Sequence, residues 1–341
     1  MAGVSFVGCW RAFARSAYFP AVVVSLILGA AAGLFAGSYT YAMANPTPHR
    51  IPTAVVGIDR GSSGRSFVDG LEEELDTSLE LHDYATYAGA REDIEEQRVF
   101  AVLRVPAGGG RVELDVSGAS GSSVAELLTK AAPKVGERVG VPVVVRDVNP
   151  LQPGDPRGLA LFYVTIAAVI TGFVGAIQLT INAPLLNPAE RIAFTAGYAL
   201  LGGFAITAVV DWLLDAVRLP FAVSWAILSL TMYASGMVFT MFNVLIGRWA
   251  MLPTWGLMVL LGNPSSGGAV SWPLLPSVLG AIGRWLPPGA SVNAQHTAVY
   301  FAGYQKADPY LVLSAWALGS TLVYWTWRHR DPGGREPGPG L

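Results

Sequence analysis

The stretch "MLPTWGLMVLLGNPSSGGAV" (residues 251–270) decides the fold of this chain, because an apolar run ends there in glycines, serines and a proline. The residues that follow, "SWPLLPSVLGAIGRWLPPGA" (residues 271–290), are short apolar pieces separated by further prolines. Three interpretations compete: a phosphate-binding loop, a surface turn, or a break in the backbone at the edge of a membrane. The rest of the sequence discriminates among them.

The composition is that of a membrane protein. Of the 341 residues, 52% are hydrophobic and 13% are charged, whereas soluble domains carry about 25% charged residues. Between Pro48 and Arg157, however, there are 18 acidic and 12 basic residues, so a polar domain is set into an apolar frame. The net charge of −2 and the lack of a lysine-rich run argue against nucleic acid as a partner.

Six uncharged runs approach the roughly 20 residues that a helix needs to cross a bilayer. The sequence therefore predicts a polytopic α-helical membrane protein with six transmembrane helices, of which the fifth is short. The runs are residues 18–43, 159–183, 192–210, 221–246, 249–262 and 310–327.

The first run, residues 18–43, follows basic residues and so shares a feature with secretory signal peptides. Its apolar core is too long for a signal peptide, and "GSYTYAMANP" (residues 37–46) is a poor cleavage site, which favours a retained anchor. Gly29, Gly33 and Gly37 repeat at a spacing that lets another helix approach closely. Ordinary tolerance of glycine in membrane helices is the alternative explanation.

The distribution of basic residues predicts the orientation. If the N-terminus is cytoplasmic, the short outer loops hold only Arg218, Arg284 and Lys306, which obeys the positive-inside rule. The inner segments then hold Arg11, Arg15, Arg191, Arg248, Arg328, Arg330 and Arg335. We expect a multi-pass plasma-membrane protein with both termini in the cytoplasm. The predicted parts are cytoplasmic ends at 1–17 and 328–341, an extracytoplasmic domain at 44–157, and five helices within 158–327 that include an outer re-entrant or interfacial segment at 263–308.

The polar domain between the first and second membrane helices is predicted to be α/β. Residues 53–58, 99–105, 111–116 and 141–148 have the composition of strands, and "SLELHDY" (residues 78–84) is a weaker candidate. The segments between them carry apolar residues at helical spacing, which gives the order β-α-β-α-β-β-α-β. At about 110 residues the domain is large enough to bury its own core.

The glycine-rich stretch is neither a phosphate loop nor a glycosylation site. A phosphate loop needs a lysine and a serine or threonine after its last glycine, and Ala269 and Val270 stand there instead. Proline in the middle position excludes glycosylation at Asn263 and Asn45. A break in the backbone is the interpretation that remains. At membrane depth such a break must be buried in protein or line a water-filled cavity.

Few titratable residues are candidates for chemistry. His296 either binds a ligand or is an ordinary solvated histidine at an interface. Asp211 and Asp215 form either an intramembrane polar site or a water-facing loop with Arg218 as their partner. With four histidines, no serine in an elbow sequence and no spacing typical of metal ligands, the sequence predicts no enzyme activity, no metal and no cofactor.

Three stretches resemble a known family. They are "IPTAVVGIDRG" (residues 51–61), "VFAVLRVPAGG" (residues 99–109) and "NPSSGGAVSWPLLPSVLGAIGRWLPPGASVNAQHTAVYFAGY" (residues 263–304). Together with the topology, they make the chain similar to the YhgE/Pip (phage infection protein) group of membrane proteins, which resemble permeases of the second class of ABC-type exporters. His296 and Thr297 stand where relatives usually have an arginine, and the cytoplasmic loop "PLLNPAERI" (residues 184–192) lacks a clear coupling helix.

The resemblance implies a dimeric membrane subunit, in contact with lipids, that moves small molecules or lipids outward. The chain has no Walker-type glycine-lysine pair, so a separate ATPase would supply the energy. Glu190 and Arg191 are then the candidates for the coupling contact. The candidate rim of the pathway is Asn263, Pro264, Ser265, Ser266, Gly267 and Gly268. The alternative function is a non-transporting scaffold or receptor whose outer domain binds a protein.

Overall fold

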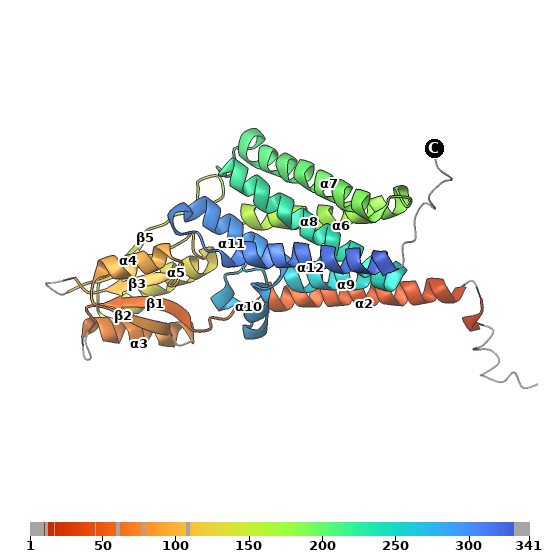
Figure 1. The fold of residues 1–341 in the computed structure, drawn as a ribbon. Coiled ribbons are helices and arrows are strands. Elements are labelled where there is room, and N and C mark those ends of the chain that lie inside the picture. The colour runs from red at the N-terminus through yellow and green to blue at the C-terminus, as the bar shows by residue number, and fades with distance from the viewer. Residues whose placement is uncertain are drawn as a thin grey trace, which may run out of the picture.

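The computed structural model describes residues 10, 13–16, 18–44, 46–58, 62–76, 79–106 and 110–330. Most of the predicted cytoplasmic ends, and parts of the stretches at 51–61 and 99–109, lie outside the described residues. The chain forms a bundle of long helices with an α/β domain at one end (Figure 1).

Four described helices are long and apolar enough to cross a membrane. They are α2 (Tyr18–Met43), α6 (Ala160–Asn182), α7 (Pro188–Ala208) continued by η1 (Val209–Leu213), and α8 (Phe221–Ile246) continued by η2 (Gly247–Trp249). The sequence predicted a membrane helix at each of these places, and these four are confirmed as candidate spans. The chain is therefore a helical membrane protein by the length and composition of its helices.

The remaining two predicted spans are helical but differ in kind. The fifth consists of α9 (Met251–Trp255) and the π-helical η3 (Gly256–Gly262), which together form a shorter apolar helix. The sixth is α12 (Asp308–Arg330), a helix of 23 residues that is less apolar than the four candidates. Their crossing of a membrane stays a prediction.

Helix α8 is the centre of the bundle and packs against α6, α7, α11 (Pro287–Tyr300) and α12. Glycines allow this close packing: a methyl group built on Gly172 would lie 2.9 Å from the Cα atom of Met232. The hydroxyl group of Tyr198 donates a hydrogen bond of 2.6 Å to the carbonyl oxygen of Gly172. Small residues and interhelical hydrogen bonds of this kind hold membrane helices together, because lipid supplies no hydrophobic drive between them.

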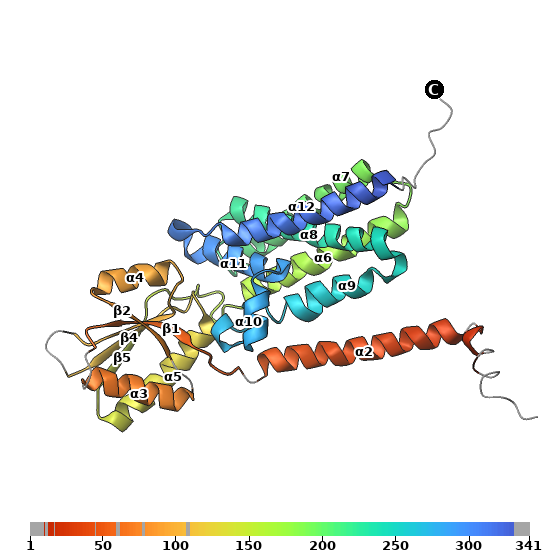
Figure 2. The same cartoon turned by 60° about the horizontal axis from the view of Figure 1, so that its bottom comes forward.

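The α/β domain contains a five-stranded sheet in the order β2-β1-β3-β4-β5. Neighbouring strands are parallel except for β3 and β4. The strands are β1 (Ile51–Val56), β2 (Leu79–Tyr84), β3 (Ala101–Arg104), β4 (Val112–Val116) and β5 (Val143–Asp147), and the helices are α3 (Ser63–Leu75), α4 (Tyr87–Glu95) and α5 (Ser122–Val139). This order of elements is the predicted one, including the weak strand candidate. Helices α3 and α5 cover one face of the sheet and α4 covers the other (Figure 2).

The segment between η3 and α11, residues 263–286, is called the broken segment here, and part of it packs into the core of the α/β domain. It contains η4 (Trp272–Leu274) and α10 (Ser277–Gly283). Val270, Leu274 and Leu275 are buried in the same apolar cluster as the inner faces of α3 and α5. We expected a re-entrant or interfacial return here, and part of the segment is instead a component of the domain core. Figure 2 shows α10 between the domain and the bundle.

Leu274→Ala tests this junction. Leu274 is 2% exposed, and truncating a buried leucine costs about 2–5 kcal/mol of stability. We expect faster amide hydrogen exchange in both α5 and residues 270–276 of the full-length protein in detergent. Val278→Ala is the control, because that side chain is 69% exposed. Unchanged exchange in α5 would show that the segment is no part of the domain core.

Candidate functional site

A cavity of about 500 Å³ lies where the α/β domain, the broken segment and the last two helices meet. Its wall combines serines, glycines and charged side chains with aromatic and aliphatic ones. The lining includes Gln97, Phe100, Ser120, Gly121 and Ser122 from the domain, Ser265, Ser266, Gly267, Gly268, Ser271, Trp272, Arg284 and Trp285 from the broken segment, and Asn293, His296, Thr297, Lys306, Asp308, Leu311 and Val312 beyond it.

Several residues that the sequence singled out meet at this cavity. Ser265, Ser266, Gly267 and Gly268 line it, and His296 of α11 lines it as well. Asn263 is buried, at 1% exposure, and lies beside Tyr39 of α2 rather than in the cavity wall. Pro264 is likewise no part of the lining. Four of the six candidate rim residues and the candidate histidine, about 30 positions apart in the sequence, therefore line one cavity.

The serines of the broken segment satisfy the backbone where the helix ends. The hydroxyl of Ser265 donates to the carbonyl oxygen of Leu261 at 2.6 Å, and the hydroxyl of Ser266 donates to that of Asn263 at 2.7 Å. Gly267 has φ +81°, a left-handed conformation that glycine adopts without strain. The residue types of this stretch thus let the backbone leave its helix while its carbonyl groups stay bonded.

Gly283 allows the broken segment to fold back on itself, and Gly268 allows it to approach α6. A methyl group built on Gly283 would overlap the backbone carbonyl of Ser265, and one built on Gly268 would lie 2.9 Å from the ring of Phe162. Only a residue without a Cβ atom permits these approaches. Backbone therefore packs against backbone where Gly283 meets Ser265, a residue that lines the cavity.

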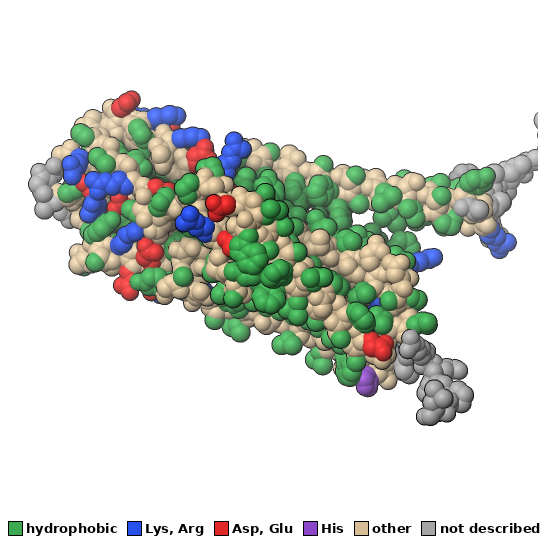
Figure 3. Space-filling view, turned by 90° about the horizontal axis from the view of Figure 1, so that it is seen from above, with side chains coloured by type: hydrophobic (Ala, Val, Ile, Leu, Met, Phe, Trp, Pro, Cys, Tyr) green, Lys and Arg blue, Asp and Glu red, His purple; other side chains and the backbone are tan. Residues whose placement is uncertain are grey.

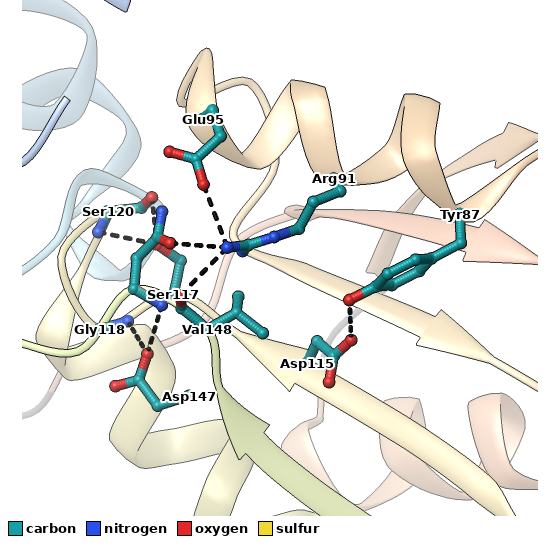
Figure 4. A network of polar contacts seen from close by, with 10 residues as sticks. Tyr87, Arg91, Glu95, Asp115, Ser117, Gly118, Ser120, Asp147 and Val148 are labelled. Atoms are coloured by element: carbon teal, nitrogen blue, oxygen red, sulfur yellow. Dashed lines mark hydrogen bonds and ion pairs between the residues drawn. The ribbon is translucent and has the colours of Figure 1, made fainter. Parts of the chain in front are cut away.

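The domain wall of the cavity is held by the network of polar contacts in Figure 4. The guanidinium of Arg91 on α4 donates to the carbonyl oxygen of Val148 at 3.1 Å and pairs with Glu95 at 3.2 Å. The carboxylate of Asp147 on β5 accepts a hydrogen bond of 3.1 Å from the backbone N–H of Gly118. These contacts fix the loop at residues 117–121, which presents Ser120 and Gly121 to the cavity.

Direct contacts join the domain to the broken segment. The hydroxyl of Ser123 accepts a hydrogen bond of 2.8 Å from the backbone N–H of Ser271, and their hydroxyl groups lie 2.8 Å apart. The ring of Phe100 lies 5.7 Å from that of Trp272 in an edge-on arrangement. The backbone N–H of His49, just after α2, donates to the carbonyl oxygen of Pro273 at 2.7 Å. The two walls of the cavity are therefore bonded to each other.

The charged groups of the lining give the cavity a positive balance. Arg284 and Lys306 face it together with one acid, Asp308. Among the described residues, neither Arg284 nor Lys306 makes an ion pair. Burial lowers the pKa of Lys306, and Arg98 acts in the same direction, while Glu96 and Asp308 oppose both. Burial also lowers the pKa of His296, so this imidazole is neutral at pH 7.

The other predicted site residues serve local structure. Glu190 completes a capping box with Asn187 at the start of α7. Arg191 is 7% exposed and donates to the hydroxyl of Thr180 and the carbonyl oxygen of Ala183, both at 3.1 Å. Buried and bonded in this way, Arg191 offers little surface to a partner, and the coupling contact stays a prediction.

Asp211 lies in η1, near the end of the candidate span Pro188–Leu213, and Asp215 lies in the turn that follows. The carboxylate of Asp211 accepts a hydrogen bond of 3.0 Å from the backbone N–H of Leu219. Asp215 is exposed and has φ +46°. The described ion pairs include none from Arg218 to either acid. Asp215 therefore fits the loop interpretation, whereas Asp211 lies within a candidate span, and a polar site at Asp211 stays a prediction.

The glycine row of α2 has no partner within the described part of the chain. A methyl group built on Gly29, Gly33 or Gly37 would meet nothing within 4 Å. Helix α2 is exposed along its length and touches η3 near the domain. Packing of this row against another helix stays a prediction. No cluster of histidine, cysteine and acidic residues suited to a metal ion occurs in the described ranges.

Two parts of the site have no functional signal in the sequence. Arg284 and Lys306 count there only as basic residues of the outer loops, and the loop "SGASGS" (residues 117–122) matches no binding motif. Its run of glycine and serine before a helix is a local signal for a tight loop. Nothing in the sequence, however, says that the loop faces the broken segment.

Comparison with known proteins adds no relative. No family model matches the chain, and no curated protein matches it either. The resemblance to the YhgE/Pip group therefore rests on the three stretches quoted above and stays an expectation.

Gly283→Ala tests the packing of Gly283 against Ser265. The added methyl group must displace the Ser265 carbonyl, and overpacking of this kind costs about 1–3 kcal/mol. We expect a lower thermal unfolding midpoint for the full chain in detergent. Gly303→Ala is the matched control, because its methyl group would meet nothing within 4 Å. Equal midpoints for the two variants would contradict the close approach.

Proposed function

We propose that this protein is a permease-like subunit of an exporter, which moves small molecules or lipids out of the cell and draws on a separate energy source. The observation that carries this proposal is the cavity between the α/β domain and the end of the helix bundle. Concave sites of 300–1,000 Å³ with mostly apolar walls and a few placed polar groups are typical of small-molecule binding. A bundle that only anchors a domain needs no such cavity.

The proposed topology has six spans, with α9 and η3 as the short fifth span and α12 as the sixth. The described chain begins and ends at the end of the bundle far from the α/β domain (Figure 1), in agreement with both termini on one side. Charged side chains gather over the domain and apolar ones over the helices (Figure 3). Exposed tryptophans stand at both ends of the bundle, Trp212 and Trp285 near the domain and Trp249 and Trp325 at the other end, as in the aromatic belts of membrane proteins.

In this proposal the cavity is the outer end of the transport pathway. The broken segment lets η3 end inside protein rather than in lipid, and the domain covers the break. Beneath it, a buried polar cluster joins three helices: the hydroxyl of Thr231 donates to that of Ser291 at 2.8 Å, and Thr165 lies 3.5 Å from the same oxygen. A substrate released from the bundle would meet polar groups here before it reaches water.

A scaffold or receptor is the second candidate. It is favoured by the cytoplasmic loop between α6 and α7, where Glu190 and Arg191 are engaged within the chain. In that case the domain would bind an outer protein and the helices would anchor it. An ATPase that co-purifies with the full-length protein would favour the exporter.

Cysteine labelling tests the orientation. In a chain with Cys9→Ser, we expect a membrane-impermeant maleimide to label Glu126→Cys, on the exposed face of α5, in intact cells. Arg248→Cys, at the opposite end of the bundle, should react only after permeabilisation. The reverse pattern would place the α/β domain in the cytoplasm.

Blocking the cavity tests transport. Asn293 is an exposed residue of the lining, and Asn293→Trp fills the cavity from its rim. We expect cells with this variant to retain fluorescent amphiphiles and lipid analogues as strongly as cells that lack the protein. Asn182→Trp, at the far end of α6, is the matched control and should behave as wild type. Equal retention in wild-type and protein-free cells across the panel would favour the scaffold.

A further inference from the structure

The cavity has the chemistry of a site for a charged head group joined to an apolar chain. Its two cations come from different elements, since Arg284 ends α10 and Lys306 precedes α12. In the described part of the chain no carboxylate pairs with either, and Asp308 is the one acid of the lining. Two cations against one acid leave a single positive charge to be matched by a ligand.

The neighbouring charges do not cancel this excess. Glu96 and Arg98, which follow α4, act on Lys306 in opposite directions. Arg98 pairs with Glu96 at 2.5 Å and also with Asp93 at 3.1 Å. Of these three residues only Glu96 and Arg98 act on Lys306. His296 is neutral at pH 7 because burial lowers its pKa. An anion is therefore the complement of the polar half of the cavity.

The other half of the cavity is apolar and reaches the surface. Phe100 and Trp272 form one wall. Trp285 and Leu311 also line the cavity, and each is 64% exposed. In the proposed topology this exposed edge lies at the level of the outer leaflet, where tryptophan side chains prefer to reside. A free inorganic anion would leave this apolar edge unused.

We propose that the cavity binds an amphiphile of the outer leaflet, with its singly anionic head between Arg284 and Lys306 and its chain along Trp285 and Leu311. The side-chain amide of Asn293, which also lines the cavity, supplies a neutral hydrogen-bond donor for the head. The amphiphile would be the substrate of the proposed exporter, so this inference rests on the proposed function. Binding of the amphiphile is tested separately from export.

Lipid retention tests the site. The full-length protein is reconstituted in bilayers of equal phosphatidylglycerol and phosphatidylcholine, extracted in a neutral maltoside detergent, and analysed by native mass spectrometry. We expect at least fivefold more phosphatidylglycerol than phosphatidylcholine on the wild type. The double variant Arg284→Gln with Lys306→Gln should lose this excess. Arg218→Gln, an exposed arginine of the α7–α8 turn outside the lining, should keep it.

Each other outcome overturns part of the proposal. Equal retention of the two lipids by the wild type would refute an anionic ligand, and retention by the double variant would place the lipid elsewhere. Displacement of the lipid by millimolar inorganic phosphate would show that the head alone is bound. Thermal unfolding of the variants confirms that they are folded. Retention without export in cells would refute only the exporter, and export without retention would refute only this site.

Discussion

The arrangement of this protein depends on one constraint: a backbone that leaves its helix at the end of an apolar bundle must have its polar groups satisfied by protein. Helix η3 ends at Gly262, and the next 24 residues contain only short helical pieces. Two carbonyl groups at this end, those of Leu261 and Asn263, accept hydrogen bonds from both serine hydroxyls and backbone N–H groups. The rest of the segment is covered by the α/β domain, whose core accepts Val270, Leu274 and Leu275.

This solution creates the cavity. Because the segment enters the domain core at residues 270–275 and returns to the bundle at α11, it encloses a space that neither part forms alone. The Arg91 and Asp147 contacts hold the domain side of that space, and the approach of Gly283 to Ser265 holds the other. The residues that allow the backbone to break thus also line the cavity, to which the glycine-rich stretch contributes four residues.

The features that could be predicted from sequence are those with a local physical cause. The apolar lengths of α2 and α8 follow from the thickness of a bilayer, and both helices have the predicted bounds, Tyr18–Met43 and Phe221–Ile246. The order of strands and helices in the domain follows from side-chain periodicity. Features that depend on the surroundings of a residue have no such local cause. The place of Val270, Leu274 and Leu275 in the domain core and the burial of Arg191 are two of them.

The sequence by itself determined that this is a helical membrane protein, that a polar α/β domain interrupts it, and that its backbone breaks after Gly262. Hydropathy and glycine content are properties of short stretches of sequence, so the features that depend on them can be recognised without knowledge of the fold. Only the tertiary structure decided what covers the break and which side chains meet there. Arg284, Lys306 and the loop at 117–122 lie far apart in the chain but line one cavity. They meet because the domain packs against the end of the bundle. Such long-range packing cannot be recognised from a local sequence pattern.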